Sequence, residues 1–166
     1  MAVDIFLKLD GIDGESQDEK HKGEIEISSY SFGASTPSSA SGGDGGGSGK
    51  VRFEDFQFTQ VTNKASPLLL QNCASGQHIK EGLLTVRKAG GGGSISGGEF
   101  LKITLDDIIV TSFQEGASLG EDLPAEQVSL NFQKITYSYQ QQSAGGVLLP
   151  PETVVIDLSH PGGGNG

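Results

Sequence analysis

The stretch FLKITLDDIIVTSF, residues 100–113, is the most informative part of this chain about its fold. It opens with apolar and polar residues in strict alternation, which predicts a half-buried β-strand. The alternation then slips by one position at Asp106–Asp107, which predicts a bulge or bend inside one long strand. The apolar residues are Leu101, Ile103 and Leu105 before the slip, and Ile108 and Val110 after it.

A second long segment, QVSLNFQKITYSYQQQ (127–142), slips in the same way between Phe132 and Ile135. Two slipped strands are what a tightly curved, closing sheet requires. Further alternating segments lie at 3–10, 23–33, 50–61, 82–88 and 152–159. Eight or so strands without alternating helices predict a mainly β fold, an antiparallel two-sheet β-barrel.

One short α-helix is expected at about residues 66–76, on the flank of the barrel. Ser66 is a suitable N-cap and Pro67 suits the first helical position, where its missing N–H costs nothing. Gly76 can adopt the left-handed conformation that ends a helix. The apolar stripe expected to face the sheet consists of Leu69, Cys73 and Ala74.

The chain of 166 residues fits a single domain, which we place at 1–160 with a flexible tail at 161–166. Residues 33–50, GASTPSSASGGDGGGSGK, are rich in glycine and serine and are expected to form a long mobile loop. A structureless loop of this length inside a domain is uncommon, and it is usually functional or disordered.

Composition excludes several classes of protein. A net charge of −10 with only 11 scattered Lys and Arg residues argues against nucleic-acid binding and against anionic membrane surfaces. No apolar run is long enough to span a membrane as a helix, and the start of the chain lacks the basic flank of a signal peptide. The single Cys73 excludes an internal disulfide framework.

The acidic stretch DGIDGESQDEKH, residues 10–21, is the first candidate for a chemical site. Its acids do not follow the alternate spacing of a helix–loop–helix calcium site, and both flanks are predicted strands. His21 beside carboxylates suits general acid–base chemistry, but the segment offers no apolar pocket to shift a pKa. We interpret it as a solvated loop, with a looser calcium site or a metal-dependent hydrolase at Asp13 and Glu15 as the alternatives.

No other pattern indicates an enzyme, a metal site or a cofactor. Cys73 falls beside Leu69 on the apolar stripe of the helix, where a buried thiol is the commoner outcome. His21, His78 and His160 show no metal-ligand spacing, and the serines fit no nucleophile motif. The glycine runs lack the Lys-Ser/Thr ending of a phosphate-binding loop.

Five segments resemble, in order, the haemolysin-coregulated protein family, the tube protein of bacterial type VI secretion systems. They are DIFLKLDGIDGESQDEKHKGEIEISSYSFG, SPLLLQNCASGQHI, GLLTVRKAGG, FLKITLDDIIVTSF and EQVSLNFQKITYSY. Together they cover most of residues 1–142. Two features depart from the family's pattern or vary freely within it: the loop at 33–50 is very rich in glycine and serine, and the tail SHPGGGNG has no clear counterpart.

The resemblance implies a two-sheet barrel whose homohexameric rings stack into a hollow tube. A contractile sheath propels this tube, a spike protein sits at its tip, and effector proteins travel in its lumen. It also implies a structural protein, assembled in the bacterial cytoplasm and then secreted without a signal peptide.

Two sets of residues are the candidates for ring contacts. Tyr30, Ser31 and Phe32 are expected near the ring wall, with Ser31 facing the lumen if the alternation holds. The stacking contact between rings is expected in the glycine-rich loop, which either orders on stacking or serves as a disordered connector. Its candidate residues are Ser35, Thr36, Pro37, Ser38, Asp44 and Gly49.

An alternative from a different class is a monomeric secreted binding module with a lipocalin-like barrel and a ligand inside it. A phage-like tail tube is a close structural relative of the leading hypothesis, and the sequence does not separate the two.

Deleting residues 38–48 should leave single rings intact and weaken their stacking into tubes, because stacking is assigned to this loop. Sedimentation of tubes from the deleted and full-length proteins measures this effect. Polymerisation that is unchanged by the deletion would contradict the assignment.

Overall fold

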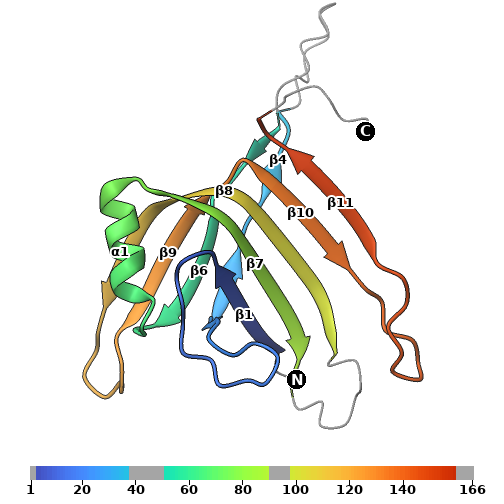
Figure 1. Ribbon diagram of the computed structural model, residues 1–166, viewed down its shortest axis with the longest axis horizontal. Coiled ribbons are helices and arrows are strands. Elements are labelled where there is room, and N and C mark those ends of the chain that lie inside the picture. The colour runs from blue at the N-terminus through green and yellow to red at the C-terminus, as the bar shows by residue number, and fades with distance from the viewer. Residues whose placement is uncertain (1–2, 38–50, 90–97, 160–166) are drawn as a thin grey trace, which may run out of the picture.

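The computed structural model describes residues 3–37, 51–89 and 98–159, and within them the chain forms eleven strands and one helix (Figure 1). The elements are β1 (Val3–Leu9), β2 (Ile25–Glu26), β3 (Ser29–Ser31), β4 (Ala34–Ser35), β5 (Arg52–Phe53), β6 (Phe56–Val61), α1 (Ser66–Ser75), β7 (His78–Lys88), β8 (Glu99–Gly116), β9 (Ala125–Asn131), β10 (Lys134–Tyr139) and β11 (Glu152–Asp157). All pairings between strands are antiparallel. The predicted mainly β fold with one short helix is therefore confirmed.

The strands close on themselves through the short segment 25–31. Strands pair in the order β2-β1-β7-β8-β9-β6-β3, and β2 and β3 are joined directly in the chain. Within the joint, the Ile27 N–H donates to the Ile5 carbonyl at 3.1 Å and the Ser28 N–H donates to the Thr59 carbonyl at 2.7 Å. We call this closed set of strands the barrel. The predicted single strand at 23–33 is thus two short strands, β2 and β3, because β2 pairs with β1 and β3 pairs with β6.

The slip predicted at Asp106–Asp107 is present as a corner in β8. Odd-numbered residues of β8 are buried before the corner and even-numbered ones after it. Asp107 has a φ of 54°, a left-handed conformation that aspartate tolerates better than most residues. Strand β7 changes its buried face at the same level, since Ile79 pairs with Ile108 and Gly82 pairs with Leu105.

The second predicted slip, at Phe132–Gln133, lies directly beside this corner. It separates β9, which pairs with the second half of β8, from β10, which pairs with the first half. The Gln133 N–H donates to the Asp106 carbonyl at 3.0 Å and holds the two bends together. One edge of β8 therefore pairs with two different strands, with β10 before the corner and with β9 after it.

The hydrophobic core fills the barrel. Its largest fully buried side chains include Phe56 and Phe58 from β6, Leu130 from β9 and Ile103 from β8. Leu69 closes one side of the core from α1 and is completely buried. Complete burial of an aliphatic or aromatic side chain contributes about 1.5–3 kcal/mol, so these residues dominate the stability of the barrel.

The helix lies where it was predicted, but two details of the prediction are wrong. Its N-cap is Ala65, which makes no side-chain cap, and Gly76 ends it with a φ of 69° as expected. The Ser66 hydroxyl instead accepts from the Asn63 N–H and donates to the buried Glu126 carboxylate at 2.8 Å. Ala74 is exposed, so Leu69 and the half-buried Cys73 alone represent the predicted stripe in the core.

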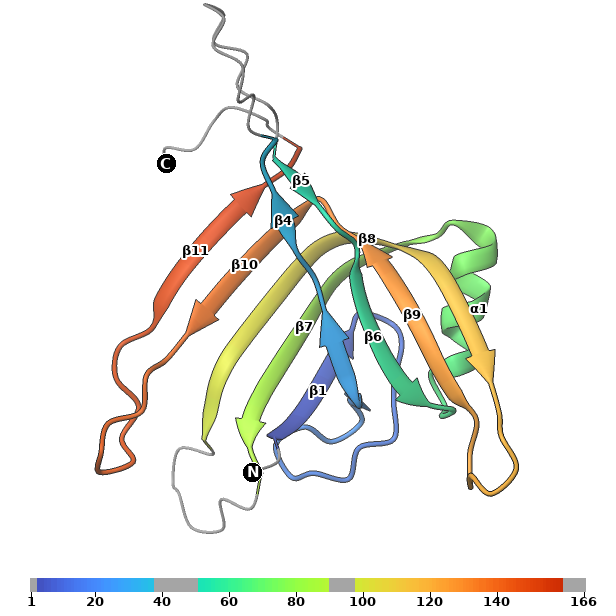
Figure 2. The same cartoon turned by 180° about the vertical axis from the view of Figure 1, so that it is seen from behind.

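Two hairpins extend beyond the barrel, as Figure 2 shows from behind. Strands β10 and β11 attach to the first half of β8 and continue the sheet sideways; we call this pair of strands the arm. Strands β4 and β5 form a separate two-stranded sheet at one end of the molecule. The predicted end of the domain at residue 160 and the predicted tail at 161–166 stay predictions, because these residues lie outside the described ones.

Replacing Asp107 by valine should destabilise the fold by about 1–2 kcal/mol, because a β-branched residue is strained in the left-handed region. The Asp107→Gly variant should lose only the small contribution of the exposed 2.6 Å contact with His78. Asp106→Val is the matched control, since Asp106 has no positive φ. Urea unfolding midpoints measure the three effects, and equal losses for Asp106→Val and Asp107→Val would contradict the account.

Candidate functional site: exposed sheet faces and a buried loop

The arm has an apolar face that the described part of the chain covers at its base, where Ile135 is buried, and leaves exposed toward β11. Its residues share a face with the buried residues of β8, because directly paired residues of antiparallel strands point to the same side. The exposed fraction rises from Ile103 at 0% to its partner Tyr137 at 37% and on to Val154 at 50%. The residues of this apolar face are Ile135, Tyr137, Tyr139, Val154 and Ile156.

Tyr30 and Phe32 lie where the barrel meets the base of the arm. The Tyr30 ring stacks on Phe56 with 5.6 Å between centroids, and Phe32 lies 6.3 Å from the Tyr137 ring. Burial and the neighbouring Tyr137 raise the pKa of the Tyr30 hydroxyl above its ordinary value. Both side chains are half-buried and pack against the core, and their place near a ring wall stays a prediction.

Ser31 points to the opposite side from its neighbours and is exposed, as the alternation predicts. It lies on the outer face of β3, β6, β9 and the second half of β8, which we call the uncharged face because its strand residues named below carry no charge. The Asp55 carboxylate lies at one end of it and accepts from Thr111 and Asn131. Direct contacts include Ser29 Oγ to Thr59 Oγ1 at 2.6 Å and Gln127 Nε2 donating to Gln57 Oε1 at 3.2 Å. The members of this uncharged face are Ser29, Ser31, Gln57, Thr59, Ser112, Gln114, Gln127 and Ser129.

The candidate stacking residues begin at the hairpin of β4 and β5. Ser35 pairs with Arg52, and Ser35, Thr36 and Pro37 are exposed at the end of the molecule. Ser38, Asp44 and Gly49 lie outside the residues that the structure describes. The hairpin thus places the two ends of the glycine-rich loop side by side, beyond the barrel.

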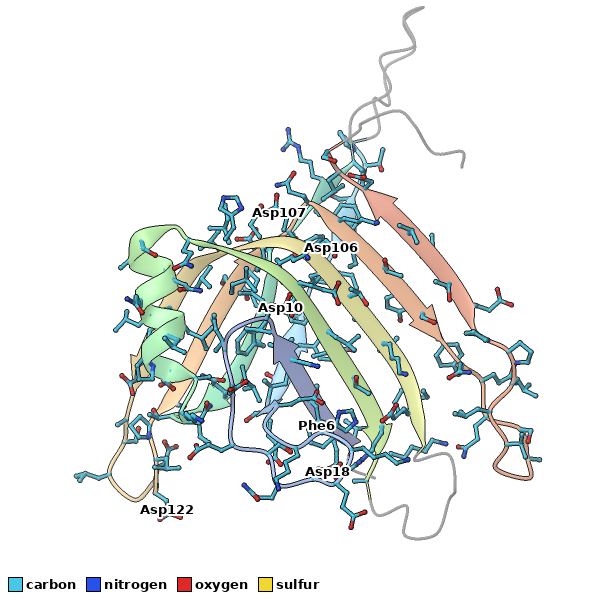
Figure 3. The ribbon with its side chains drawn as sticks, in the orientation of Figure 1. Phe6, Asp10, Asp18, Asp106, Asp107 and Asp122 are labelled. Carbon is cyan, nitrogen blue, oxygen red and sulfur yellow. The ribbon has the colours of Figure 1, made fainter. Side chains whose placement is uncertain are left out.

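The acidic stretch is a loop with most of its acids exposed, as predicted, but Asp18 and His21 are docked on the sheet, which corrects the prediction in part. Arg87 of β7 bridges the loop to the sheet by binding Asp18 in the loop and Asp4 on β1. Its guanidinium also lies 4.9 Å from the centroid of the Phe6 ring, as a cation–π contact. Figure 3 shows Phe6 and Asp18 close together at this edge of the sheet.

His21 closes the other side of the same cluster and is only 6% exposed. Its ring stacks on Phe6 with 4.3 Å between centroids. Nδ1 lies 2.9 Å from Glu24 Oε2, and Nε2 lies 2.8 Å from Glu99 Oε1. The histidine thus joins the loop to β8. The sequence analysis expected no apolar surface beside His21, but the face of the Phe6 ring provides one.

Close backbone contact also holds the loop in place. A Cβ atom on Gly14 would lie 2.5 Å from the Glu24 carbonyl oxygen, so only glycine fits there. The Asp18 carboxylate accepts from the N–H groups of Lys20 and His21 at 3.0 and 3.3 Å, which is the expected turn chemistry. The signal that the sequence offered was Phe6, an aromatic residue on the supposed solvent face of the first strand.

Across 3–37, 51–89 and 98–159, no group of three or more His, Cys, Asp and Glu residues could hold a metal ion. Cys73 is half-buried against the core. In the same ranges, no helix has the length and hydropathy needed to span a membrane.

The geometry therefore defines a class of protein built around contact surfaces: a β-barrel with an uncovered arm and an uncharged polar face. The family model described as type VI secretion system effector, Hcp, matches residues 6–139. The chain is 43% identical over 146 residues to protein hcp1 of Pseudomonas aeruginosa, covering 88% of both chains.

Solved structures agree with this match. Hcp1 from Salmonella typhimurium is 38% identical with a TM-score of 0.77, covering 96% of this chain and 97% of that one. A type six secretion system protein reaches a TM-score of 0.86 at 28% identity, covering 95% and 97%. A type VI secretion system effector from Yersinia pestis has a TM-score of 0.72 at 30% identity, covering 93% and 99%.

The chain belongs to the haemolysin-coregulated protein family, and it is a component of the type VI secretion system tube. The predicted family and mainly β fold are confirmed by these matches.

Acid should release the contact between the acidic loop and the sheet. Hydrogen bonds from Arg87 are the largest cause that lowers the pKa of Asp18 from 3.8 to about 2. Because the folded-state pKa is depressed, this carboxylate stabilises the fold above pH 3.8, and its contribution is lost as the pH falls toward 2. A carboxyl titration followed by NMR should give a midpoint of about 2 for Asp18.

The Arg87→Met variant should shift that midpoint upward toward 3.8, since the largest lowering contribution is removed. Hydrogen bonds from the N–H groups of Lys20 and His21 remain in the variant and limit the shift. An unchanged Asp18 midpoint in Arg87→Met would contradict the assignment of the pKa shift to Arg87.

Proposed function

We propose that this protein is a structural, non-enzymatic subunit that self-assembles into hexameric rings, and that these rings stack into the hollow inner tube. Membership of the tube-protein family supports self-assembly. Association through a closed ring requires a heterologous contact, in which two different surfaces of the same chain meet.

The observation that carries the proposal is the uncovered apolar face of the arm. Within the barrel, the same sheet face is buried almost completely, from Leu105 at 2% to Ile103 at 0% exposure. On the arm, Tyr137, Tyr139 and Val154 are 37–50% exposed, although Phe32 contacts the Tyr137 ring at the base of the arm. A continuous apolar face of this kind marks a protein contact, and a second copy of the chain is the partner that a ring provides.

The uncharged polar face around Ser31 is the proposed wall of the lumen. Its serine, threonine and glutamine side chains bond to one another, so they present a hydrated surface without a strong preference for either charge. Such a wall suits the passage of effector proteins that differ in charge. Tyr30 and Phe32 support this wall from behind through their packing on Phe56.

The hairpin of β4 and β5 is the proposed site of stacking between rings. It projects beyond the barrel and belongs to no larger sheet, so its end is available to the next ring. Ser35, Thr36 and Pro37 would lie at the edge of this contact, with the remaining loop residues between them and Arg52.

The wider context follows from the family. We place the finished tube inside a contractile sheath, with a spike protein at its tip, and effectors in its lumen. Assembly would take place in the bacterial cytoplasm, and release would need no signal peptide.

Negative-stain images of the purified protein test the proposal, because hexameric rings with a central hole should be visible. The Val154→Asp variant should show at least about tenfold fewer rings, since it places an unpaired charge in the contact. Val155→Asp is the matched control: Val155 is 55% exposed on the same strand but points to the opposite face.

Rings in the control and their loss in Val154→Asp, with unchanged far-UV circular dichroism for both, would support the proposal. Absence of rings in the unmodified protein, or rings in Val154→Asp at the level of the control, would overturn it.

A further inference from the structure

A group of oxygen atoms lies beside the N-terminus of α1, at the base of the hairpin that joins β8 to β9. Figure 3 marks the end of this hairpin with Asp122. The centre of the group is the Glu126 carboxylate of β9, which is buried with its residue only 2% exposed. Glu115 of β8 is paired with Glu126, so the two carboxylates lie on the same face of the sheet. We call the following residues the oxygen cluster: Gln60, Thr62, Glu115, Pro124 and Glu126.

The buried Glu126 carboxylate is held by neutral donors. Its Oε1 accepts from Gln60 Nε2 at 2.7 Å and from the Ser66 hydroxyl at 2.8 Å. Among the described residues, neither Glu126 nor Glu115 forms an ion pair with a Lys, Arg or His side chain. The N-terminus of α1 offers only about half a positive charge. Buried charges in proteins are normally paired or coordinate a metal ion, so this carboxylate requires a further positive group.

The Thr62 hydroxyl faces more acceptor atoms than it can serve. Its Oγ1 lies 2.9 Å from Glu115 Oε1 and 2.9 Å from Glu126 Oε2. The Pro124 carbonyl oxygen lies 3.4 Å away from the same atom. A hydroxyl carries one hydrogen, and ionised carboxylates and carbonyls only accept. At least one of the two short contacts therefore brings two oxygen atoms together without a hydrogen between them.

Gln60 gives an independent sign of the same deficit. Its side chain is aimed at Glu126, to which its amide nitrogen donates, and the residue is 1% exposed. Its buried amide oxygen has no hydrogen-bond partner in the part of the chain that the structure describes. Because buried acceptors without a partner are rare in folded proteins, this one indicates that a positive group is missing. Unserved acceptors thus lie beside both oxygens of the Glu126 carboxylate.

We propose that the oxygen cluster binds one Ca²⁺ ion. Its protein ligands are Glu115 Oε1, Glu126 Oε2, the Thr62 hydroxyl and the Pro124 carbonyl. Calcium takes about six to eight oxygen ligands at roughly 2.3–2.6 Å in a flexible geometry, so ligand oxygens around one ion lie about 3 Å apart. The 2.9 Å contacts of Thr62 Oγ1 match this spacing.

The surroundings of the oxygen cluster favour calcium over magnesium and suggest a modest affinity. Glu115 is exposed, so the ion has a path from solvent and water can complete its coordination. Mg²⁺ demands a nearly ideal octahedron and gives up its waters reluctantly, so it should bind more weakly to these irregular ligands. With only two carboxylates, the Kd for Ca²⁺ should be about 0.1–1 mM. The inference goes beyond the proposed function and does not depend on ring formation.

Titration calorimetry of the full-length protein with CaCl2 measures the binding, and one ion per chain is expected. Calcium should also stabilise the fold, because it binds the folded chain. In urea unfolding, 10 mM CaCl2 should lower the equilibrium constant for unfolding by at least about tenfold relative to 10 mM MgCl2.

Glu115→Gln and Glu121→Gln are a matched pair of variants on this hairpin. Both remove one negative charge from an exposed residue, but Glu121 does not belong to the oxygen cluster. Glu115→Gln should weaken calcium binding by at least about tenfold, because a carboxylate ligand becomes a neutral amide. Glu121→Gln should bind calcium like the unmodified protein. Unchanged far-UV circular dichroism verifies that both variants are folded.

The outcomes separate a specific site from the general attraction of calcium to a chain with a net charge of −10. Weaker binding in Glu115→Gln, with unchanged binding in Glu121→Gln, supports the site. Equal binding by the two variants overturns it, because calcium then responds only to net charge. Absence of calcium binding by the unmodified protein also overturns it, and a proton shared by Glu115 and Glu126 would then complete the oxygen cluster.

Discussion

Strand β8 has to satisfy two neighbours on one of its edges, and the corner at Asp106–Asp107 makes this geometry feasible. Its second half pairs with β9 and closes the barrel, whereas its first half pairs with β10 and leaves the barrel. The change of buried face at the corner turns apolar residues of both halves toward the core. Without the corner, one half of the strand would place its leucines and isoleucines in water.

The same division of β8 explains why the arm is uncovered. The layer that buries Leu101, Ile103 and Leu105 ends with the barrel, but the sheet to which they belong continues for two more strands. A chain of this design leaves part of its apolar surface to be buried by association. In the proposed ring, the closed barrel supplies the stability of a single subunit, and the arm supplies the contact between subunits.

Local patterns predicted the strands and both slips, because alternation records which face of a strand is buried. The docking of the acidic loop was missed because it depends on partners far along the chain. Asp18 meets Arg87 at a separation of 69 residues, and His21 meets Glu99 at 78. The exposure of Tyr137 was equally beyond local reasoning, since its spacing fits a buried face and only the extent of the opposite layer decides. Ser66 is not the N-cap because the helix begins one residue earlier than expected, after Ala65, and the Ser66 hydroxyl instead links Asn63 to Glu126.

The central claim is that one copy of this chain leaves an apolar sheet face that another copy covers. The most direct test is the mass of the folded, full-length protein in solution, measured by light scattering during size-exclusion chromatography. We predict a mass of about six times that of one chain, as a closed heterologous ring of six subunits requires. A folded protein with the mass of a single chain at every concentration would contradict the claim.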